Sequence, residues 1–448
     1  MIISRKIIQV ISSIPGVRKK KIILYTWLFF TLIFSIQDLS CHKKEPLKIE
    51  DLYAGQTTLS AREKFKTDLI ANTIEKNLVK SLTDENEGSW EDAFWGMALT
   101  GYHSETTGKA IQSALDRYET RSISFQRSLL ESIGTVYPGK FIQDIKRIIK
   151  ETAHPKIFAM AAHLLLLADP DEREKIILVL KTKFQSWQNH PILIMLEYDL
   201  SFTPDQIEKN KPPIQDLLRY PLEKGKVVIY SFQRPNRDFP GLALFRQADG
   251  NFLRDLSGNL FHVQQLSRSL SNLPGYLTNG NSPQGIYSLQ GTDQSENLFI
   301  GPTPNLQMVL PFEVPSSKFF HSGNPADTVW SQERYRDLLP ASWQTYLPIW
   351  EAYHAGRAGR SEIIAHGTTI DINFYQDKPY FPFTPSLGCL TTKEIWSEKT
   401  GRCLYSDQLA LANAYLSSPT RQGYLVLVEI DDKNQPVQLD EILKYFDN

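Results

Sequence analysis

The chain has 448 residues, of which 41% are hydrophobic and 11% aromatic, a composition typical of a folded globular protein and not of a disordered one. Its 49 lysines and arginines nearly balance its 50 acidic residues, so the net charge of -1 supplies no field that would attract nucleic acid. Because the length exceeds what one hydrophobic core usually organises, we expect two folded domains with additional segments.

The amino-terminal segment has the pattern of an export signal. Basic residues precede the apolar run Ile22–Ile36, which is as long as the hydrophobic region of a signal peptide and short for a spanning helix. A leucine and a small residue stand directly before Cys41 and resemble a bacterial lipobox, although Asp38 is unusual at its position. We expect residues 1–41 to direct export and Cys41 to carry a lipid; an uncleaved membrane anchor is the alternative.

Residues 42–60 are polar and contain Pro46 and Gly55, as expected of a tether. Across residues 61–218, apolar residues recur three and four apart between prolines and glycines, which predicts helices in series. The stretch His154–Phe184 resembles a HEAT unit, with a proline at a helix start, an Ala/Leu-rich helix and an Asp-Pro turn. We expect an α-helical scaffold domain, either HEAT-like or non-repetitive, that offers a surface to a protein partner.

Beyond the helical region the pattern changes to short strands. Gly225–Gln233 and Gln422–Asp431 are rich in β-branched residues and predict strands at the two ends of a β-rich domain over residues 222–431. A carboxy-terminal helix is expected within residues 436–448. Residues 328–360 read as a helical insertion between strands. The predicted fold class is therefore α+β, with a helical domain followed by a β-rich one.

The predicted insertion is unusually aromatic. Trp330, Trp343, Trp350 and Tyr353 recur along its helical segments. They either pack on helix faces, which we favour, or form a lid over a substrate. His154 and His163, in the helical region, are expected at a helix start and on a packed face and not as metal ligands.

The sequences His366-Gly367 and Ser-Leu-Gly-Cys at residues 386–389 are the strongest candidates for catalytic chemistry. Cysteine attacks as the thiolate, a minor species near neutral pH, so it needs a basic neighbour. His366 ends a strand-like segment, and two adjacent strands joined by a loop would bring it to Cys389. Gly367 would allow a sharp turn, and Gly388 would let backbone N–H groups approach an oxyanion beside the thiol.

The second candidate role for the thiols is structural. If the protein is exported, Cys389 and Cys403 fold where thiols are oxidised, so a disulfide between them is an alternative to a reactive cysteine. The spacing of the two residues does not exclude this bond.

Together, H-G followed by S-x-G-C in an exported β-rich chain resembles the L,D-transpeptidase family of bacterial cell-wall enzymes, also called YkuD-like. The segment Ser282–Leu289 is similar to the family's T-P-x-G-x-[FY] strand. The resemblance covers about Gly225–Ile430. It implies acyl transfer on peptidoglycan stem peptides through a thioester, without a metal or an organic cofactor, in a periplasm-facing lipoprotein of the bacterial envelope.

The resemblance also assigns roles to the candidate residues. Cys389 would be the nucleophile and His366 the base that activates it. The backbone N–H groups of Gly388 and Cys389 would form the oxyanion hole, and Ser386 would hold the turn.

Two positions depart from the family pattern. Many members have a histidine where this chain has Leu387 and an arginine where it has Thr391. Without that arginine, Arg357, Arg360 or Arg402 would have to grip a substrate carboxylate. The S-x-G-C-[IL] pattern without the extra histidine looks more like the divergent YafK-like branch, some members of which hydrolyse.

Several alternatives stay open. Within the family, the protein would be a hydrolase, either an L,D-carboxypeptidase or an amidase that releases peptidoglycan-linked groups. A sortase-like site of His321, Cys389 and Arg402 is disfavoured, because S-L-G precedes the cysteine. The missing arginine favours a third alternative, a non-catalytic envelope lipoprotein that acts as a scaffold or binding module.

Overall fold

The computed structural model describes residues 46–446, which belong to one compact unit. The predicted export signal and Cys41 lie outside the described residues. The described part contains a series of helices and a closed β-barrel, so the α+β class is as predicted. Within residues 46–446 we find no helix that is long and apolar enough to cross a membrane.

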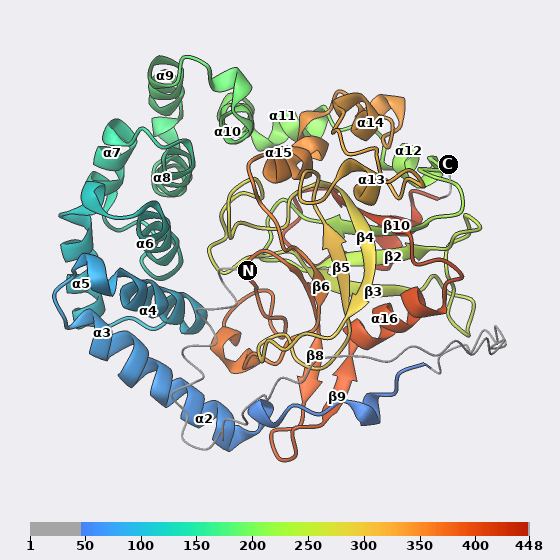
Figure 1. The fold of residues 1–448 in the computed structure, drawn as a ribbon, viewed down its shortest axis with the longest axis horizontal. Helices are drawn as coiled ribbons and strands as arrows, with labels where there is room; N and C mark the ends of the chain where they lie inside the picture. The colour runs from blue at the N-terminus through green and yellow to red at the C-terminus, as the bar shows by residue number, and fades with distance from the viewer. Residues whose placement is uncertain (1–45, 447–448) are drawn as a thin grey trace, which may run out of the picture. The chain divides into compact units, whose positions relative to one another are not determined.

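The first part of the chain is helical, and its helices form two rows. Helices α4, α6, α8 and α10 contact one another in sequence, while α7 and α9 pack on the outer side of this row (Figure 1). Such a two-layer arrangement agrees with the helix–turn–helix pattern expected around Pro155, although the HEAT assignment stays a prediction. The helices of this part are α2 (Leu59–Asp68), a π-helical turn η3 (Leu69–Glu75), α3 (Lys76–Leu78), α4 (Glu87–Thr100), α5 (Glu105–Leu115), α6 (Ile123–Val136), α7 (Ile142–Glu151), α8 (Pro155–Ala168), α9 (Arg173–Lys183), α10 (Pro191–Ser201), α11 (Pro204–Lys209) and α12 (Ile214–Arg219).

The second part is built around the barrel. Its strands are β1 (Val227–Gln233), β2 (Gly241–Arg246), β3 (His262–Leu266), β4 (Gly285–Asp293), β5 (Asn305–Val309), β6 (Ala365–His366), β7 (Leu390–Thr392) and β10 (Gly423–Glu429), in the order β1-β10-β4-β5-β6-β7-β3-β2. The pairs β1/β10 and β6/β7 are parallel, and all other neighbours are antiparallel. The two strands predicted at the ends of this part thus lie side by side as β1 and β10.

Three smaller elements complete this part. The hairpin of β8 (Glu394–Trp396) and β9 (Cys403–Ser406) forms a separate sheet, and α16 (Asp407–Ser417) and α17 (Leu439–Leu443) follow. The expected carboxy-terminal helix is therefore present as α17. After the Asp249-Gly250 turn, Phe252 forms an isolated antiparallel bridge with Arg246.

The aromatic insertion is a series of short helices and not a continuous helical segment. After α13 (Ser316–Phe319) come α14 (Gln332–Arg336), two 3-10 turns and α15 (Glu351–Arg357). Trp343 is fully buried, and its ring N–H donates to the Pro213 carbonyl at 3.0 Å. Trp343, Trp350 and Tyr353 belong to the core around the barrel, and the partly buried Trp330 packs against it. This agrees with packing on helix faces; a lid over a substrate is compatible with such packing and stays a prediction.

The helical and β-rich parts share one hydrophobic core. The core of the helical part also contains Leu270, Tyr276 and Tyr375 from loops that belong to the β-rich part. Hydrogen bonds cross the same boundary: the Tyr375 hydroxyl donates to the Leu99 carbonyl at 3.0 Å, and the Tyr276 hydroxyl donates to the Asp199 carboxylate at 3.0 Å. The change from helices to strands near residue 220 therefore divides the chain by secondary structure, but the two parts share one hydrophobic core.

The stability of this junction is expected to depend on pH. Burial, with Glu351 nearby, raises the pKa of Asp199 to about 8. Because the folded state binds this proton more tightly than the unfolded chain, the stabilisation is present below pH 4 and is lost as pH rises towards 8. We expect the free energy of unfolding to fall by more than about 1 kcal/mol between pH 5 and 8 in urea titrations.

The variant Asp199→Asn imitates the protonated acid and should show a shallower fall over the same range. Asp205→Asn, which changes an exposed aspartate on the next helix, serves as the control and should keep the wild-type slope. Equal slopes in the wild type and in Asp199→Asn would contradict a raised pKa at Asp199.

Candidate active site

The pairing of β6 with β7 brings the two candidate catalytic residues to neighbouring strands. In this parallel pair, Ala365 lies opposite Leu390 and His366 opposite Thr391. The Leu390 N–H donates to the Ile364 carbonyl at 3.0 Å, so Cys389 stands beside Ile364. Ala365 and Leu390 face the core of the barrel. By the alternation of side chains, Cys389 and His366 share the outer face, with His366 two positions further along.

His366 is a buried, neutral imidazole. Its Nδ1 lies 2.5 Å from the Gly367 carbonyl oxygen, which requires that Nδ1 carries the proton. This tautomer leaves Nε2 as the acceptor. Burial lowers the pKa of His366 to about 4, so the ring is uncharged at neutral pH and able to accept a proton.

Cys389 is half-buried, and its thiol is protonated at neutral pH. The thiol donates to the Glu362 carbonyl at 3.5 Å. Burial raises the pKa of the Cys389 thiol to about 11, although the positive charge of Arg360 opposes the shift. A hydrogen bond with the Ile364 backbone also opposes the rise of the thiol pKa. The side-chain hydrogen bonds found for Cys389 and His366 within residues 46–446 are to the backbone and not to each other. The site therefore contains a neutral thiol near a neutral imidazole.

The second described cysteine is not bonded to the first. Cys389 and Cys403 are both free thiols, and Cys403 is buried at the start of β9, where it donates to the Tyr405 carbonyl at 3.3 Å. The structural disulfide considered as an alternative is absent from the described part of the chain.

The turn before Cys389 is held by Ser386. Its hydroxyl accepts from the Gly388 N–H at 3.0 Å and donates to the Cys389 carbonyl at 2.9 Å. The Gly388 N–H is therefore used inside the turn, which corrects its expected role as an oxyanion donor. No acceptor is assigned to the Cys389 N–H within residues 46–446, so this group is the one left to receive an oxyanion.

The segment Ser282–Leu289, far away in sequence, lies against the same turn. The Ser282 hydroxyl donates to the Gly388 carbonyl at 2.9 Å, and the Ser282 N–H donates to the Ser267 carbonyl at 2.9 Å. The Gln284 N–H donates to the buried Glu351 carboxylate at 2.9 Å. The residues just before β4 thus contact the turn Ser386–Cys389, which we call the thiol turn, from one side.

Only one of the three candidate arginines reaches this turn. The buried Arg360 guanidinium donates to the carbonyls of Gly275, Gly280 (2.6 Å) and Asn281 (2.7 Å), and packs on Gly388. Its donors bind the loop, so it positions the turn and contributes charge. Arg357 lies 3.5 Å from the Asn189 carbonyl of the helical part, and Arg402 donates to the Glu50 backbone carbonyl at 2.8 Å beside the β8/β9 hairpin. These two do not join the Cys389 turn as we had expected.

Gly367 is required for a different reason from the one expected. Its backbone is not in the left-handed region; instead, the Glu394 carboxylate occupies the space where a Cβ would lie. Glu394 accepts from Thr303 at 2.7 Å, from Ser406 at 2.6 Å and from the Thr368 N–H at 2.8 Å, and burial raises its pKa to about 7. Nothing in the local sequence of β8 marks Glu394 as a neighbour of His366-Gly367, so its place in the site could not be predicted.

The two departures from the family pattern fit their surroundings. Thr391 is 1% exposed, and its hydroxyl donates to the Thr384 carbonyl at 2.7 Å. An arginine at this position would bury a charge in a space that holds a threonine. Leu387 packs against the core of the helical part, where a histidine would lose apolar contact.

The sortase-like arrangement is not formed. His321 Nε2 lies 3.0 Å from the Ser288 hydroxyl and 2.9 Å from the Gly423 carbonyl, at the start of β10. The strand directions place the start of β10 at the opposite end of the barrel from the start of β7, which follows Cys389. With Arg402 at the β8/β9 hairpin, the three residues do not meet.

The chain matches no family model, no curated protein and no solved structure in the three comparisons made. Within residues 46–446, no cluster of three or more His, Cys, Asp or Glu side chains is arranged to hold a metal ion.

The neutral state of the thiol leads to a prediction for its reactivity. In a Cys403→Ala background, the rate of Cys389 alkylation should rise about tenfold per pH unit from pH 7 to 10 without levelling, because the thiol pKa is about 11. Replacing His366 by alanine should leave this profile nearly unchanged, since the imidazole makes no hydrogen bond to the thiol. A plateau near pH 7 that disappears in His366→Ala would instead reveal a preformed thiolate–imidazolium pair.

Proposed function

We propose that the protein is a cysteine-dependent acyltransferase of the L,D-transpeptidase type that acts on peptidoglycan stem peptides. The proposal is supported by the meeting of the three segments that the resemblance assigns to one site: Ser282–Leu289, His366-Gly367 and Ser386–Cys389. These segments are separated by many residues in sequence, and their resemblance to the family does not by itself require contact.

In the proposed reaction, the Cys389 sulfur attacks an amide carbonyl of a stem peptide next to the L-centre of diaminopimelate. His366 Nε2 takes the thiol proton and returns it to the leaving amine, with release of D-alanine or another attached group. Because the free thiol and imidazole are both neutral, the proton moves with the attack and not before it. The Cys389 N–H would stabilise the oxyanion.

An acceptor then resolves the thioester. An amine would complete a transpeptidation, and water would complete a hydrolysis, as in the YafK-like alternative. Either reaction fits a lipid-anchored protein that faces the periplasm, with the helical part as a scaffold or partner surface. No cofactor takes part in the proposed chemistry.

A non-catalytic binding lipoprotein is the second candidate. The raised pKa of the Cys389 thiol and the use of the Gly388 N–H inside the turn favour it, since both reduce the catalytic equipment of the site. The arginine that the family uses for a substrate carboxylate is also replaced by the buried Thr391.

Intact-protein mass spectrometry with purified muropeptides tests the proposal. We expect an adduct with the mass of the donor peptide minus its leaving group, mapped by digestion to the peptide that contains Cys389. Cys403→Ala should retain the adduct, and the product mass separates transfer from hydrolysis. If several stem peptides give neither adduct nor product while the protein is folded and Cys389 is reactive towards a thiol reagent, the binding lipoprotein becomes the better assignment.

A further inference from the structure

A basic pocket lies where the helical part meets α15. It has a volume of about 350 Å³ and is lined by the starts of α8 and α10 and by the end of α15. Its ionisable lining residues are His154, Lys156, His190 and Arg357, and none of its described lining residues is acidic. We call this cavity, with these four ionisable residues, the basic pocket. Of these residues, only Arg357 is a candidate for the thiol site, and it points to Asn189 and not to Cys389.

The two helices that open into the basic pocket have uncapped amino termini. Both α8 and α10 begin with a proline that follows a histidine, and neither has a hydrogen bond from a capping side chain. The N–H groups of their first turns therefore lack intrahelical acceptors, and both helix dipoles present their positive ends. The helices are 14 and 11 residues long, so these dipoles are fully developed.

The two histidines that line the basic pocket each have one buried ring nitrogen. The Nδ1 atoms of His154 and His190 are buried and have no hydrogen-bond partner. Burial, together with the charges of His154, Arg357 and Lys156, lowers the pKa of His190. An unpaired buried nitrogen is unfavourable unless a ligand completes its hydrogen bond. Burial also lowers the pKa of His154, so near neutral pH the positive charge of the basic pocket comes from Lys156 and Arg357, together with the two helix starts.

Glu131, a carboxylate that does not line the basic pocket, interacts with the charge of Lys156. Burial and the charge of Arg127 lower the pKa of Lys156, and Glu131 opposes this shift only in part. Glu131 also accepts from Asn279 at 3.0 Å and pairs with Arg127 at 3.6 Å. Lys156 itself donates to the Thr278 hydroxyl at 2.7 Å. No carboxylate is paired with Arg357 among the described residues, and its guanidinium has only the Asn189 carbonyl at 3.5 Å as a partner.

We propose that the basic pocket binds an oxyanion, a carboxylate or a phosphate, carried by a larger ligand. A planar guanidinium, an ammonium group and the N–H groups of two helix starts suit both kinds of oxyanion. The pocket shares no residue with the Cys389 turn, so binding here does not depend on acyl transfer. Arg357 stands three residues before Arg360, which packs on Gly388, and a bound anion would therefore lie on the same segment that supports the thiol turn.

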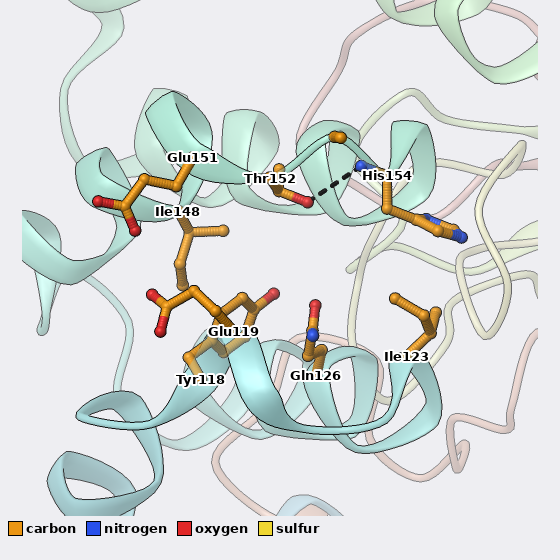
Figure 2. Close-up of a pocket in the computed structure, with 9 residues that line it drawn as sticks. Tyr118, Glu119, Ile123, Gln126, Ile148, Glu151, Thr152 and His154 are labelled. Atoms are coloured by element: carbon orange, nitrogen blue, oxygen red, sulfur yellow. Dashed lines mark hydrogen bonds between the residues drawn. The ribbon is translucent and has the colours of Figure 1, made fainter.

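The rest of the ligand has a place to lie in an adjoining groove. This groove has a volume of about 400 Å³ and shares His154 with the basic pocket. Figure 2 shows Glu119 and Glu151 at the end away from His154, and both carboxylates face Arg147 within ion-pair distance. Ile123, which is exposed, provides apolar surface at the His154 end (Figure 2). The Tyr118 hydroxyl, on a side chain that is 2% exposed, also lacks a partner.

Histidine NMR of the full chain tests this inference with two probes, inorganic phosphate and N-acetyl-D-alanine. We expect saturable shifts of the His154 and His190 signals with at least one probe, and the responding probe identifies the kind of oxyanion. The double variant Lys156→Gln/Arg357→Gln should weaken binding at least tenfold. Lys150→Gln/Arg336→Gln removes the same charge from exposed positions elsewhere and should bind like the wild type.

The outcomes separate the basic pocket from the thiol chemistry. Cys389→Ala should bind the probes as tightly as the wild type, whether or not the protein transfers acyl groups. The inference is overturned if neither probe shifts the two histidines, or if both double variants lose affinity equally, which would indicate general charge attraction. Glutamine at residue 156 retains a donor for Thr278, and thermal unfolding of each variant verifies that it remains folded.

Discussion

Replacing Cys389 by alanine is expected to abolish the acyl adduct and to lower muropeptide turnover by at least about 10³-fold. The sulfur is the only atom in the proposed site that forms a covalent bond to the substrate. In the proposed reaction His366 transfers a proton and forms no bond to the acyl carbon. Single-turnover mass spectrometry measures the adduct, and product analysis over hours measures any residual turnover.

The comparison with Cys403→Ala makes this result specific to the site. Cys403 is a free thiol in the same part of the chain, but it is buried in the small cluster around Trp396 and lies on the separate β8/β9 hairpin. Its loss should leave turnover within about twofold of the wild type. If Cys389→Ala continued to form product at the wild-type rate, the chemistry would lie elsewhere and the acyltransferase proposal would be wrong.

The regular elements were the most predictable part of this fold. β1 and β10 are continuous apolar runs that lie buried in the barrel, and such runs have a clear pattern in sequence. The alternation of helices with Pro and Gly breaks likewise predicts the helical part. The shared core was not predictable, because the loops that carry Leu270 and Tyr375 into the helical part have no periodicity of their own.

The sequence allowed us to predict which residues form the candidate site, but not the contacts that their side chains make. The H-G and S-x-G-C sequences suggested that His366 and Cys389 lie on neighbouring strands, and β6 and β7 are adjacent. The sequence did not predict that the Gly388 N–H would be used by Ser386, or that Glu394 would fill the space beside Gly367. Both facts depend on side-chain positions at close range, which residue spacing does not specify.

The basic pocket could not be predicted from the sequence either, because its residues come from distant parts of the chain. His154 and His190 each precede a proline at a helix start, and singly each reads as an ordinary helix boundary. Only the packing of α10 on α8, and of α15 on α10, joins them with Lys156 and Arg357. A cluster built from three distant segments leaves no signature in any one of them.

Replacing Gly388 by alanine is expected to destabilise the protein and to disable the site. Gly388 has φ +112°, where an L-residue is strained, and an added Cβ would lie 2.5 Å from the Gly280 carbonyl and closer still to Arg360. Neither neighbour can retreat easily, since Arg360 is held by three carbonyls of the 275–281 loop. Strain and overpacking together should cost about 2–5 kcal/mol in urea unfolding.

Gly291→Ala is the matched control for this change. Gly291 has a similar φ of +119°, but no atom lies within 4 Å of the Cβ position, so its replacement should cost only about 1–2 kcal/mol of backbone strain. The difference between the two variants therefore measures the contact of Gly388 with Arg360 and Gly280. If both lost the same stability, that contact would be readily relieved, and Arg360 would not hold the Cys389 turn in place.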